Sequence, residues 1–486
     1  MQVFFVDRRQ VERVGPVPGI DLADVRELFK RRLVSDGTAI VLDSAMQPVE
    51  PVSSWLRAVA RDCKPKTSRA YAYIALRLMD FLAARGLGLL TAAETDLTEY
   101  RQWRREDQDK PISGATWDKE AAAINSFYRW AVACGHLRTR PWRSAGGRRD
   151  SFRSGVERDM RVRHMTLEQY LYFRDVGLGG HTPDGEVDFS FRGWSPQRNR
   201  AGVELALLTG MRLQEWSTVL LPELGTGVRR PGEPADFGLS ACAKFGRPRT
   251  VHVPAAVLSQ VDTYMHLERE HIVRSAQPVL KARCQELFVV SRIQHDAGKL
   301  HGRLDGRKVV RHIADMEPWL RRITVLDTGE RLEPLALFVG QGGRMLQPSS
   351  WDKIRWHAWD RMTRFAAEHE TPVMPRHRWL FHNLRHTFAL RLLIFLTEQE
   401  LSDGKAADAP MSTLLDHMTC NPILRVQDCL GHASPATTYR YIRYLKDPMR
   451  DVADAFRGWS AQDGASYAEI ALQVMAPGRR SDAAQG

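Results

Sequence analysis

Two short motifs near the C-terminal end of the sequence hold residues that could act on a phosphate group. The first is His-Asn-Leu-Arg-His at 382–386, and the second is Leu-Gly-His-Ala-Ser-Pro-Ala-Thr-Thr-Tyr-Arg-Tyr at 430–441. Arginine and histidine can bind an anion, and a tyrosine hydroxyl can attack it as a nucleophile. No metal-ligand spacing joins the two motifs. The combination therefore predicts phosphoryl chemistry performed by side chains alone.

Two upstream segments add positive charge to this set. Arg212 lies in Thr-Gly-Met-Arg-Leu-Gln-Glu (209–215), after a glycine break and at the start of a predicted helix. Lys244 lies in Ala-Lys-Phe-Gly-Arg (243–247), on the turn of a predicted hairpin. Taken singly, an arginine after glycine, a lysine on a turn and a lone histidine are ordinary surface or structural residues. Together they are informative, because all these motifs occur in one order within one region of the chain.

Three tyrosines lie within six residues of one another at the end of the second motif, Tyr439, Tyr441 and Tyr444. Tyr439 and Tyr441 are two residues apart, so they cannot share one face of a helix. An aromatic cluster on a helix is most often a packing feature, which leaves at most one of the three for chemistry.

The elements that must position these residues are mainly helical. Residues 51–142 repeat apolar side chains every three or four positions, and Ser113 can cap a helix that ends at Gly135. Downstream, helices are predicted at 198–209, 254–274 and 385–398, with a hairpin formed by 237–243 and 249–253. Residues 292–333 look like an irregular, charged insertion. The predicted fold class is therefore mainly α with a small antiparallel β-sheet (α+β).

The composition changes sharply between the two helical regions. Between Leu137 and Met165 there are nine arginines and only three acids, Asp150, Glu157 and Asp159. A loose cationic segment of this kind can follow a phosphate backbone and release its counterions. The predicted organisation is a lead-in without assigned function (1–50), a helical DNA-binding domain (51–142), a basic linker (143–165), a catalytic domain (166–460) and a tail (461–486).

The whole-chain composition limits the class of protein. The 486 residues are 43% hydrophobic and 26% charged, with a formal net charge of +12. The content is typical of a globular protein, and the excess charge favours a polyanionic partner, most often nucleic acid. No apolar run is long enough to span a membrane. The six cysteines form no C-x-x-C pair, which predicts a reducing, cytoplasmic setting.

The ordered set of motifs resembles the tyrosine recombinase (phage integrase) family. The resemblance rests on Ala-Leu-Leu-Thr-Gly-Met-Arg-Leu-Gln-Glu, the lysine-bearing hairpin, His-Asn-Leu-Arg-His-Thr-Phe-Ala and the Leu-Gly-His to Tyr-Arg-Tyr stretch. It covers roughly residues 51–445, and the region 51–142 looks like the core-binding domain of the family. It implies two domains that clamp duplex DNA, acting as a homotetramer on two sites, with accessory proteins in some systems.

Carried over to this sequence, the resemblance implies six active-site residues and one supporting residue. Arg212 and Arg385 would stabilise the transition-state charge, with His382 as base or proton partner and His432 on the scissile phosphate. Lys244 would protonate the leaving oxygen, and Glu215 would orient its neighbours. The nine-residue step from His432 selects Tyr441 as the nucleophile, whose phenolate the cationic site should favour. The expected product is a 3′-phosphotyrosyl link, made without metal, ATP or another cofactor.

Two departures from the family pattern and two other functions remain open. His386 and His432 are 46 residues apart, which predicts an insertion within 397–422, and the segment 292–333 is a second candidate insertion. A helix near 467–475 could dock on a neighbouring subunit or on its own domain. One alternative function is a DNA-binding accessory protein that has lost catalysis. The other is a type IB topoisomerase-like enzyme that relaxes DNA by the same chemistry.

Overall fold

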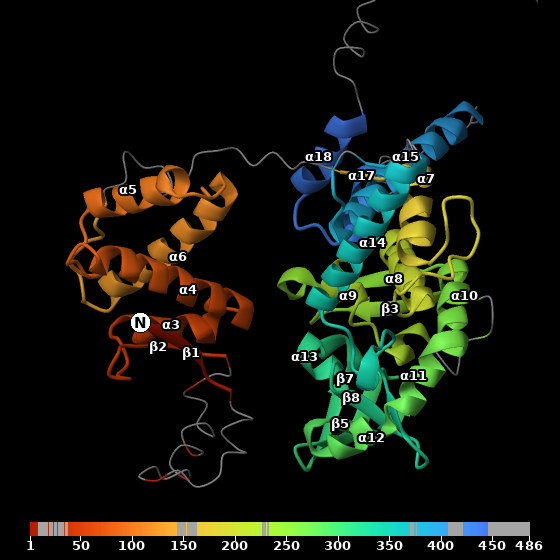
Figure 1. Cartoon of the computed structure of the whole chain (residues 1–486), viewed down its shortest axis with the longest axis horizontal. Helices are drawn as coiled ribbons and strands as arrows, with labels where there is room; N and C mark the ends of the chain where they lie inside the picture. The colour runs from red at the N-terminus through yellow and green to blue at the C-terminus, as the bar shows by residue number, and fades with distance from the viewer. Residues whose placement is uncertain are drawn as a thin grey trace, which may run out of the picture. The chain divides into compact units, whose positions relative to one another are not determined.

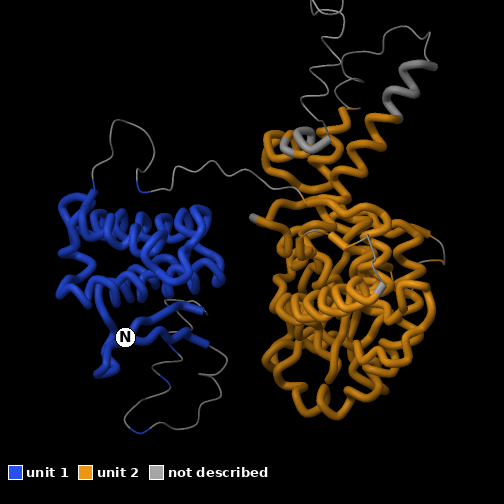
Figure 2. Tube along the Cα trace, turned by 45° about the horizontal axis from the view of Figure 1, so that its top comes forward, with its two compact units in different colours: residues 1–159 blue, residues 160–486 orange. Residues whose placement is uncertain are grey.

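The chain folds as two units, Met1–Asp159 and Met160–Gly486 (Figure 2), each with its own hydrophobic core. The structure is a computed structural model. It describes residues 1–7, 37–142, 163–225, 233–369, 377–406 and 421–445, with the single residues Pro18, Ala23, Glu27, Val34, Phe152, Arg230, Met374 and Pro375. Most of the predicted basic linker, the helix near 467–475 and the tail lie outside the described residues.

Unit 1 is a helical bundle with a two-stranded antiparallel sheet packed against it (Figure 1). Its elements are β1 (Gln2–Phe5), β2 (Ala39–Leu42), α3 (Val52–Asp62), α4 (Pro65–Ala83), α5 (Glu94–Gln102), a π-helical turn (Trp103–Asp107) and α6 (Gly114–Ala133). The Ser113 side chain caps α6 by accepting a hydrogen bond from the Thr116 amide, as the sequence predicts. Strand β2 belongs to the core, since Ala39 and Val41 are fully buried against α3 and α4.

Unit 2 begins with helices that surround an aromatic core. Its first part contains α7 (Leu167–Leu171) and the π-helical segment after it (Tyr172–Leu178), α8 (Pro196–Thr209), α9 (Leu213–Trp216), β3 (Ala235–Leu239), β4 (Arg249–Val253), α10 (Ala255–Tyr264), α11 (Glu270–Ser275) and α12 (Gln277–Ala282). The hairpin is present, with β3 and β4 paired antiparallel. The core is built around Trp216, whose ring meets those of Phe338, Trp351 and Phe381 edge to face.

The C-terminal part of unit 2 is again helical. It contains α14 (Pro348–His369), α15 (Phe381–Ala406), α17 (Pro422–Leu430) and α18 (Pro435–Leu445). Helix α15 extends well beyond the predicted 385–398, so the first part of the proposed 397–422 insertion is a continuation of this helix. The rest of that insertion, up to residue 420, lies outside the described residues.

The interpretation of residues 292–333 as irregular is wrong. This segment contributes to all five strands of a sheet in the order β7-β6-β5-β8-β9, at the end of unit 2 away from α17 and α18 (Figure 1). Its strands and short helix are β5 (Phe288–Gln294), β6 (Lys299–Leu304), β7 (Arg307–His312), α13 (Pro318–Arg321), β8 (Thr324–Asp327) and β9 (Leu332–Pro334). The β5–β8 pair is parallel and the other pairs are antiparallel.

The arrangement of elements confirms the predicted fold class. Helices dominate both units, the sheets are small and mostly antiparallel, and a helical N-terminal unit precedes a larger mixed one. Within the described part of the chain, no helix is both long and apolar enough to cross a membrane.

Candidate active site

Arg385 lies at the centre of the site and joins three helices. It is on α15, is only 1% exposed, and donates to the carbonyls of Gly210 and Leu430, each at 2.6 Å. Those carbonyls lie at the C-terminal ends of α8 and α17, where unpaired carbonyls and the helix dipole favour a cation. The arginine therefore fixes both helix ends and keeps its remaining N–H groups for a ligand.

Glycines at these two helix ends allow the close approach. Gly210 has φ +62°, and a Cβ there would lie 2.4 Å from the Phe388 ring. Gly431 follows α17 with φ +60°, and a Cβ there would lie 3.0 Å from Arg249. Both positions need the left-handed backbone that glycine adopts at little cost. The glycines of the Thr-Gly-Met-Arg and Leu-Gly-His motifs are thus explained by packing around the site.

Arg212 and Glu215 form a second centre at the start of α9. The Glu215 carboxylate accepts from the Arg212 amide at 2.8 Å and from its guanidinium at 2.9 Å. Arg249, from β4, completes the arrangement with a bond of 2.6 Å to the same carboxylate. Glu215 is 1% exposed, whereas about a fifth of the Arg212 side chain is exposed. The carboxylate thus holds Arg212 in place while part of its guanidinium remains accessible.

The two arginines keep Glu215 ionised in spite of its burial. Burial alone would raise its pKa, but the hydrogen bond and charge of Arg249, with the charge of Arg212, outweigh it and lower the pKa to about 2. Burial and the nearby Arg212 lower the pKa of Arg385, which nevertheless stays cationic at neutral pH. The site therefore combines three arginines with one carboxylate and carries excess positive charge.

Tyr441 projects from α18 into this cationic site. It is 1% exposed, and its hydroxyl lies 3.0 Å from Nδ1 of His386. Its ring is stacked on His432 with a centroid distance of 6.1 Å and an interplanar angle of 5°. Tyr439 is 54% exposed. The structure therefore brings Tyr441, rather than Tyr439, to the arginines.

The expectation that the site favours the phenolate of Tyr441 is not met in the free protein. Burial raises the pKa of Tyr441, and the opposing charges of Arg385 and Arg212 do not overcome it. Burial, helped by neighbouring positive charge, lowers the pKa of both His386 and His432 to about 3. At neutral pH the free site thus holds a neutral phenol beside neutral histidines, of which His386 shares a hydrogen bond with the Tyr441 hydroxyl.

His382 and Lys244 lie at the solvent side of the site. Although more than a third of His382 is exposed, partial burial of its ring lowers its pKa, and Arg385, Arg212 and Lys244 add to the effect. The influence of Lys244 shows that its ammonium group lies near the histidine. Lys244 itself is exposed and begins a 3-10 turn (Lys244–Gly246) between β3 and β4. All seven residues singled out in the sequence therefore gather in one region.

Sequence reasoning missed two residues of this arrangement. His386, rather than His382, is the hydrogen-bond partner of Tyr441. It stands in the quoted His-Asn-Leu-Arg-His motif, and its position one turn beyond His382 on the same helix was the available signal. Arg249 binds Glu215 across 34 residues, and a strand arginine carries no local signal for such a contact.

An open cleft adjoins the site and is lined from two sides. Strand β4 and the turn before it contribute Arg247, Arg249 and His252, and the end of α17 contributes Gln427 and His432. Its rim is rich in cationic and hydrogen-bonding groups, which suits a phosphate backbone leading to Tyr441.

Comparison with known proteins finds one family match, within the N-terminal unit. Residues 52–135 match the model of the phage integrase N-terminal SAM-like domain. This match confirms the resemblance to the tyrosine recombinase (phage integrase) family that the sequence motifs indicate. No curated protein matches the chain.

Among solved structures, the chain is similar to XerH site-specific recombinase bound to a palindromic difH substrate in a post-cleavage complex. The identity is 14%, the match covers 93% of this chain and 94% of the other, and the TM-score is 0.48. It is also similar to the Tn1549 transposon integrase in complex with circular intermediate DNA, at 15% identity, with 80% and 93% coverage and a TM-score of 0.40.

Proposed function

We propose that this chain, with its phage integrase SAM-like domain, is a tyrosine site-specific recombinase that cuts and rejoins duplex DNA through Tyr441. The observation that carries the proposal is the buried Tyr441 hydroxyl, hydrogen-bonded to a neutral histidine and surrounded by Arg212, Arg385 and His432. A buried phenol beside a proton acceptor and two arginines suits attack on a phosphate.

Binding of the scissile phosphate would use the arginine donors that the protein leaves available. Arg385 donates two N–H groups to helix carbonyls, and Glu215 binds Arg212 from one side. The remaining N–H groups can form bonds to the two non-bridging oxygens, which gain charge in the transition state. Burial first, and nearby positive charge second, depress the histidine pKa values. The phosphate would offset the positive charge, so the histidines would become better proton acceptors once DNA is bound.

The chemical step exchanges one phosphodiester for another. The Tyr441 oxygen attacks phosphorus while its proton passes to Nδ1 of His386, and the bond from phosphorus to the 5′ oxygen breaks. Lys244 donates a proton to that oxygen, which leaves as a 5′-hydroxyl, and His432 and His382 contact the phosphate. Because the phosphotyrosyl link preserves the ester, a 5′-hydroxyl of another strand can reverse the step without ATP or a metal ion.

The remaining parts of the chain supply DNA binding and assembly. The SAM-like region and the arginine-rich linker at 143–165 would hold the duplex, with residues 166–460 as the catalytic domain. We further propose action in the cytoplasm, as a homotetramer on two sites, in the service of a mobile element.

The direct test is a covalent adduct on nicked duplex DNA. Footprinting on the DNA beside the protein's own gene would first locate a bound site. A nick placed one to three nucleotides beyond each candidate cleavage position lets the short 5′-hydroxyl fragment diffuse away, so the adduct accumulates. We expect a species resistant to denaturing gel electrophoresis whose DNA-linked peptide contains Tyr441. Tight binding without any adduct would instead support a catalytically silent accessory protein.

A topoisomerase-like role predicts a different product from the same adduct. Supercoiled plasmid carrying the bound site would be relaxed efficiently, and two such sites would yield no recombinant. We expect recombinant product with two sites in the same reaction.

A further inference from the structure

A second cationic surface lies on the β6–β7 hairpin, far from Tyr441 in unit 2. Residues 299–312 contain five lysines or arginines and one acid, Asp305, which gives a net charge of +4. The register pairs Arg303 with Lys308, His301 with Val310, and Lys299 with His312. Because directly opposed residues share a face of a sheet, these six side chains lie on one face. The opposite face carries Leu300, Val309, Arg307 and Arg311.

The paired cations on this face have no acidic partner among the described residues. Lys299, Arg303 and Lys308 are all exposed, and no ion pair within the described ranges involves them. Like charges directly opposite each other in adjacent strands are destabilising. A polyanion that lies across the pair would remove this repulsion.

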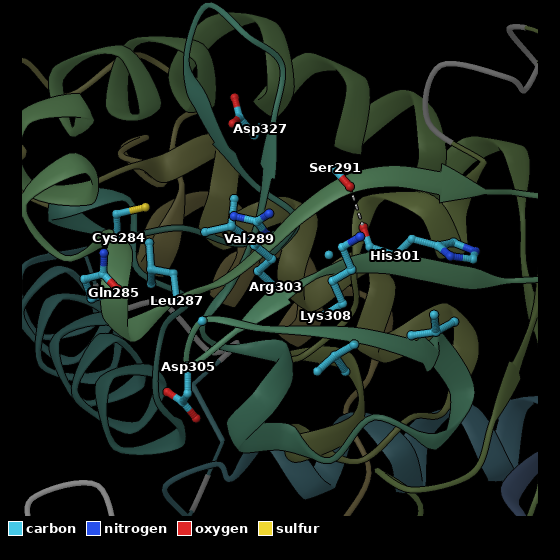
Figure 3. A pocket seen from close by; sticks show the side chains of 14 residues that line it. Cys284, Gln285, Leu287, Val289, Ser291, His301, Arg303, Asp305, Lys308 and Asp327 are labelled. Atoms are coloured by element: carbon cyan, nitrogen blue, oxygen red, sulfur yellow. Dashed lines mark hydrogen bonds between the residues drawn. The ribbon is translucent and has the colours of Figure 1, made fainter. Parts of the chain in front are cut away.

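The face is hollow and uncovered over the hairpin. Val289, His301, Arg303, Lys308 and Val310 line a pocket, with Asp305 and Asp327 at opposite edges of it (Figure 3). Where the same face continues onto β8 and β9, Leu280 of α12 covers it and packs with Val325 and Leu332. The apolar side chains on the other face, Val290 and Leu300, pack into the body of unit 2. This face is therefore left open over its most basic part, the β6–β7 hairpin.

The hairpin has a defined shape and a firm attachment. Asp305 and Gly306 have φ of +50° and +74°, as a tight two-residue hairpin turn requires. Gly302 lies against the carbonyl of Val289, where a Cβ would approach to 2.2 Å, beside a bulge in β5. These features fix where the cationic side chains point.

Buried bonds connect the sheet region to the backbone that carries the candidate active site. Arg321 is 1% exposed and donates to Glu223 at 2.7 and 2.8 Å and to the Thr218 carbonyl at 3.2 Å. The Ala241 amide donates to the Ala314 carbonyl at 2.9 Å. Thr218 and Ala241 are each three residues from Glu215 and Lys244, respectively. A ligand on the hairpin would therefore be held at a fixed position relative to the site.

We propose that the His301–Arg303–Lys308 face of this hairpin binds the phosphate backbone of double-stranded DNA, as a contact separate from that at the scissile phosphate. The inference rests on the proposed function for the identity of the polyanion. Its charge, its open face and its rigid attachment to the segments that carry Glu215 and Lys244 favour a regular duplex held in register with the site. The cations occupy the middle of the face and the two acids its edges, and such a predominantly cationic surface favours backbone binding over base readout.

The test compares two double variants of the full-length chain that remove the same charge from opposite faces. Arg303→Ala with Lys308→Ala empties the proposed surface, and Arg307→Ala with Arg311→Ala is the matched control. Binding to a fluorescein-labelled 50-bp duplex of mixed sequence is measured by anisotropy over a range of KCl concentrations. Loss of two phosphate contacts should reduce the slope of log K against log salt by about 2 for the first pair. The control pair should leave the slope within about 0.5 of the unaltered protein.

Each outcome bears on one proposal separately. An unchanged slope in Arg303→Ala with Lys308→Ala, or an equal fall in both pairs, overturns the hairpin surface. An equal fall in both pairs would mean a general charge effect. An unchanged slope would leave the face for another class of partner, such as an acidic protein. Adduct formation at Tyr441 is scored in parallel. If the adduct at Tyr441 forms but the salt slope of the Arg303→Ala, Lys308→Ala variant is unchanged, only the hairpin inference is wrong. If the slope falls but no adduct forms, only the recombinase proposal is wrong.

Discussion

In the described part of each unit a buried glutamate lies between two arginines, and the two arrangements differ in the hydrogen-bond partner of the neighbouring tyrosine. In unit 1, Glu120 accepts from Arg104 at 2.5 and 3.0 Å, from Arg77 at 3.1 Å and from the Tyr100 hydroxyl at 3.1 Å. Arg104 is 6% exposed and gives a further bond to Gln108. Both arginines and the tyrosine donate to the same carboxylate, so Glu120 is satisfied from within unit 1, with Arg104 buried and the Arg77 side chain 40% exposed.

In unit 2 the buried glutamate binds two arginines but not the tyrosine, and Arg212 is the more exposed of the two arginines. Glu215 binds Arg249 and one side of Arg212, and the tyrosine bonds to a histidine instead of the carboxylate. Burial raises the pKa of both tyrosines and nearby arginines oppose it in both, but the charge of Glu120 further raises the pKa of Tyr100. A tyrosine on a carboxylate keeps its proton. A tyrosine beside a neutral histidine and two arginines can give its proton up when a phosphate arrives.

The largest effect should come from exchanging the two tyrosine hydroxyls for hydrogen. Tyr441→Phe should abolish adduct formation, by at least about a thousandfold, and leave DNA affinity within about twofold, because only the nucleophile is lost. Tyr100→Phe should keep adduct formation and lower the stability of unit 1 by about 1–2 kcal/mol, because Glu120 loses a donor. Adduct yield on nicked DNA and thermal unfolding measure the two effects.

Tyr439→Phe is the matched control for the nucleophile, since Tyr439 is on the same helix and exposed. It should behave as the unaltered protein. Adduct that survives in Tyr441→Phe but disappears in Tyr439→Phe would reverse the assignment.

The two arginine networks also show what a sequence can predict. The motifs at 209–215, 382–386 and 430–441 carry their signal in local spacing, so the sequence alone predicts Arg212, Arg385, His432 and Tyr441 as site residues. Arg249 cannot, because its contact with Glu215 depends on how β4 packs beside α9. His386 is visible in its motif, but only the path of α18 decides which histidine meets Tyr441.

The sheet at Phe288–Pro334 was predicted wrongly for a different reason. Its high charge suggested an irregular insertion, yet Asp305-Gly306 between two runs that contain valine and leucine is a strong signal for a hairpin. Much of the charge belongs to β7, an exposed edge strand that lysine and arginine protect from pairing with other chains, and to its neighbour β6. Helix α15 exceeded its predicted end for a related reason, since its last turns are polar and the apolar repeat that marks a helix fades there.

The second prediction removes one arginine from each network. Arg104→Ala should destabilise unit 1 by about 3 kcal/mol or more, because a buried carboxylate loses its main partner. Arg212→Ala should cost less than about 1 kcal/mol, because Arg249 still pairs with Glu215, but should slow adduct formation by about a hundredfold or more. Denaturant unfolding and single-turnover cleavage separate the two. A large stability loss in Arg212→Ala with normal cleavage would make the two networks equivalent and remove the distinction.

The smallest effect tests the neutral histidine that distinguishes Tyr441 from Tyr100. Burial, with His382 and Arg385 nearby, holds the pKa of His386 at about 3 in the folded chain, against about 6.5 when unfolded. The unfolded state therefore binds the proton first, and stability is lost as pH falls below 6.5. At pH 5 this one group should lower the stability by about 2 kcal/mol relative to pH 7.5.

His386→Gln, whose amide oxygen can still accept from Tyr441, should lose that part of the pH dependence. Hydrogen exchange in α15, compared with α6 of unit 1, measures it within one molecule. An equal pH response in the variant would mean that His386 is not the neutral acceptor of the Tyr441 proton.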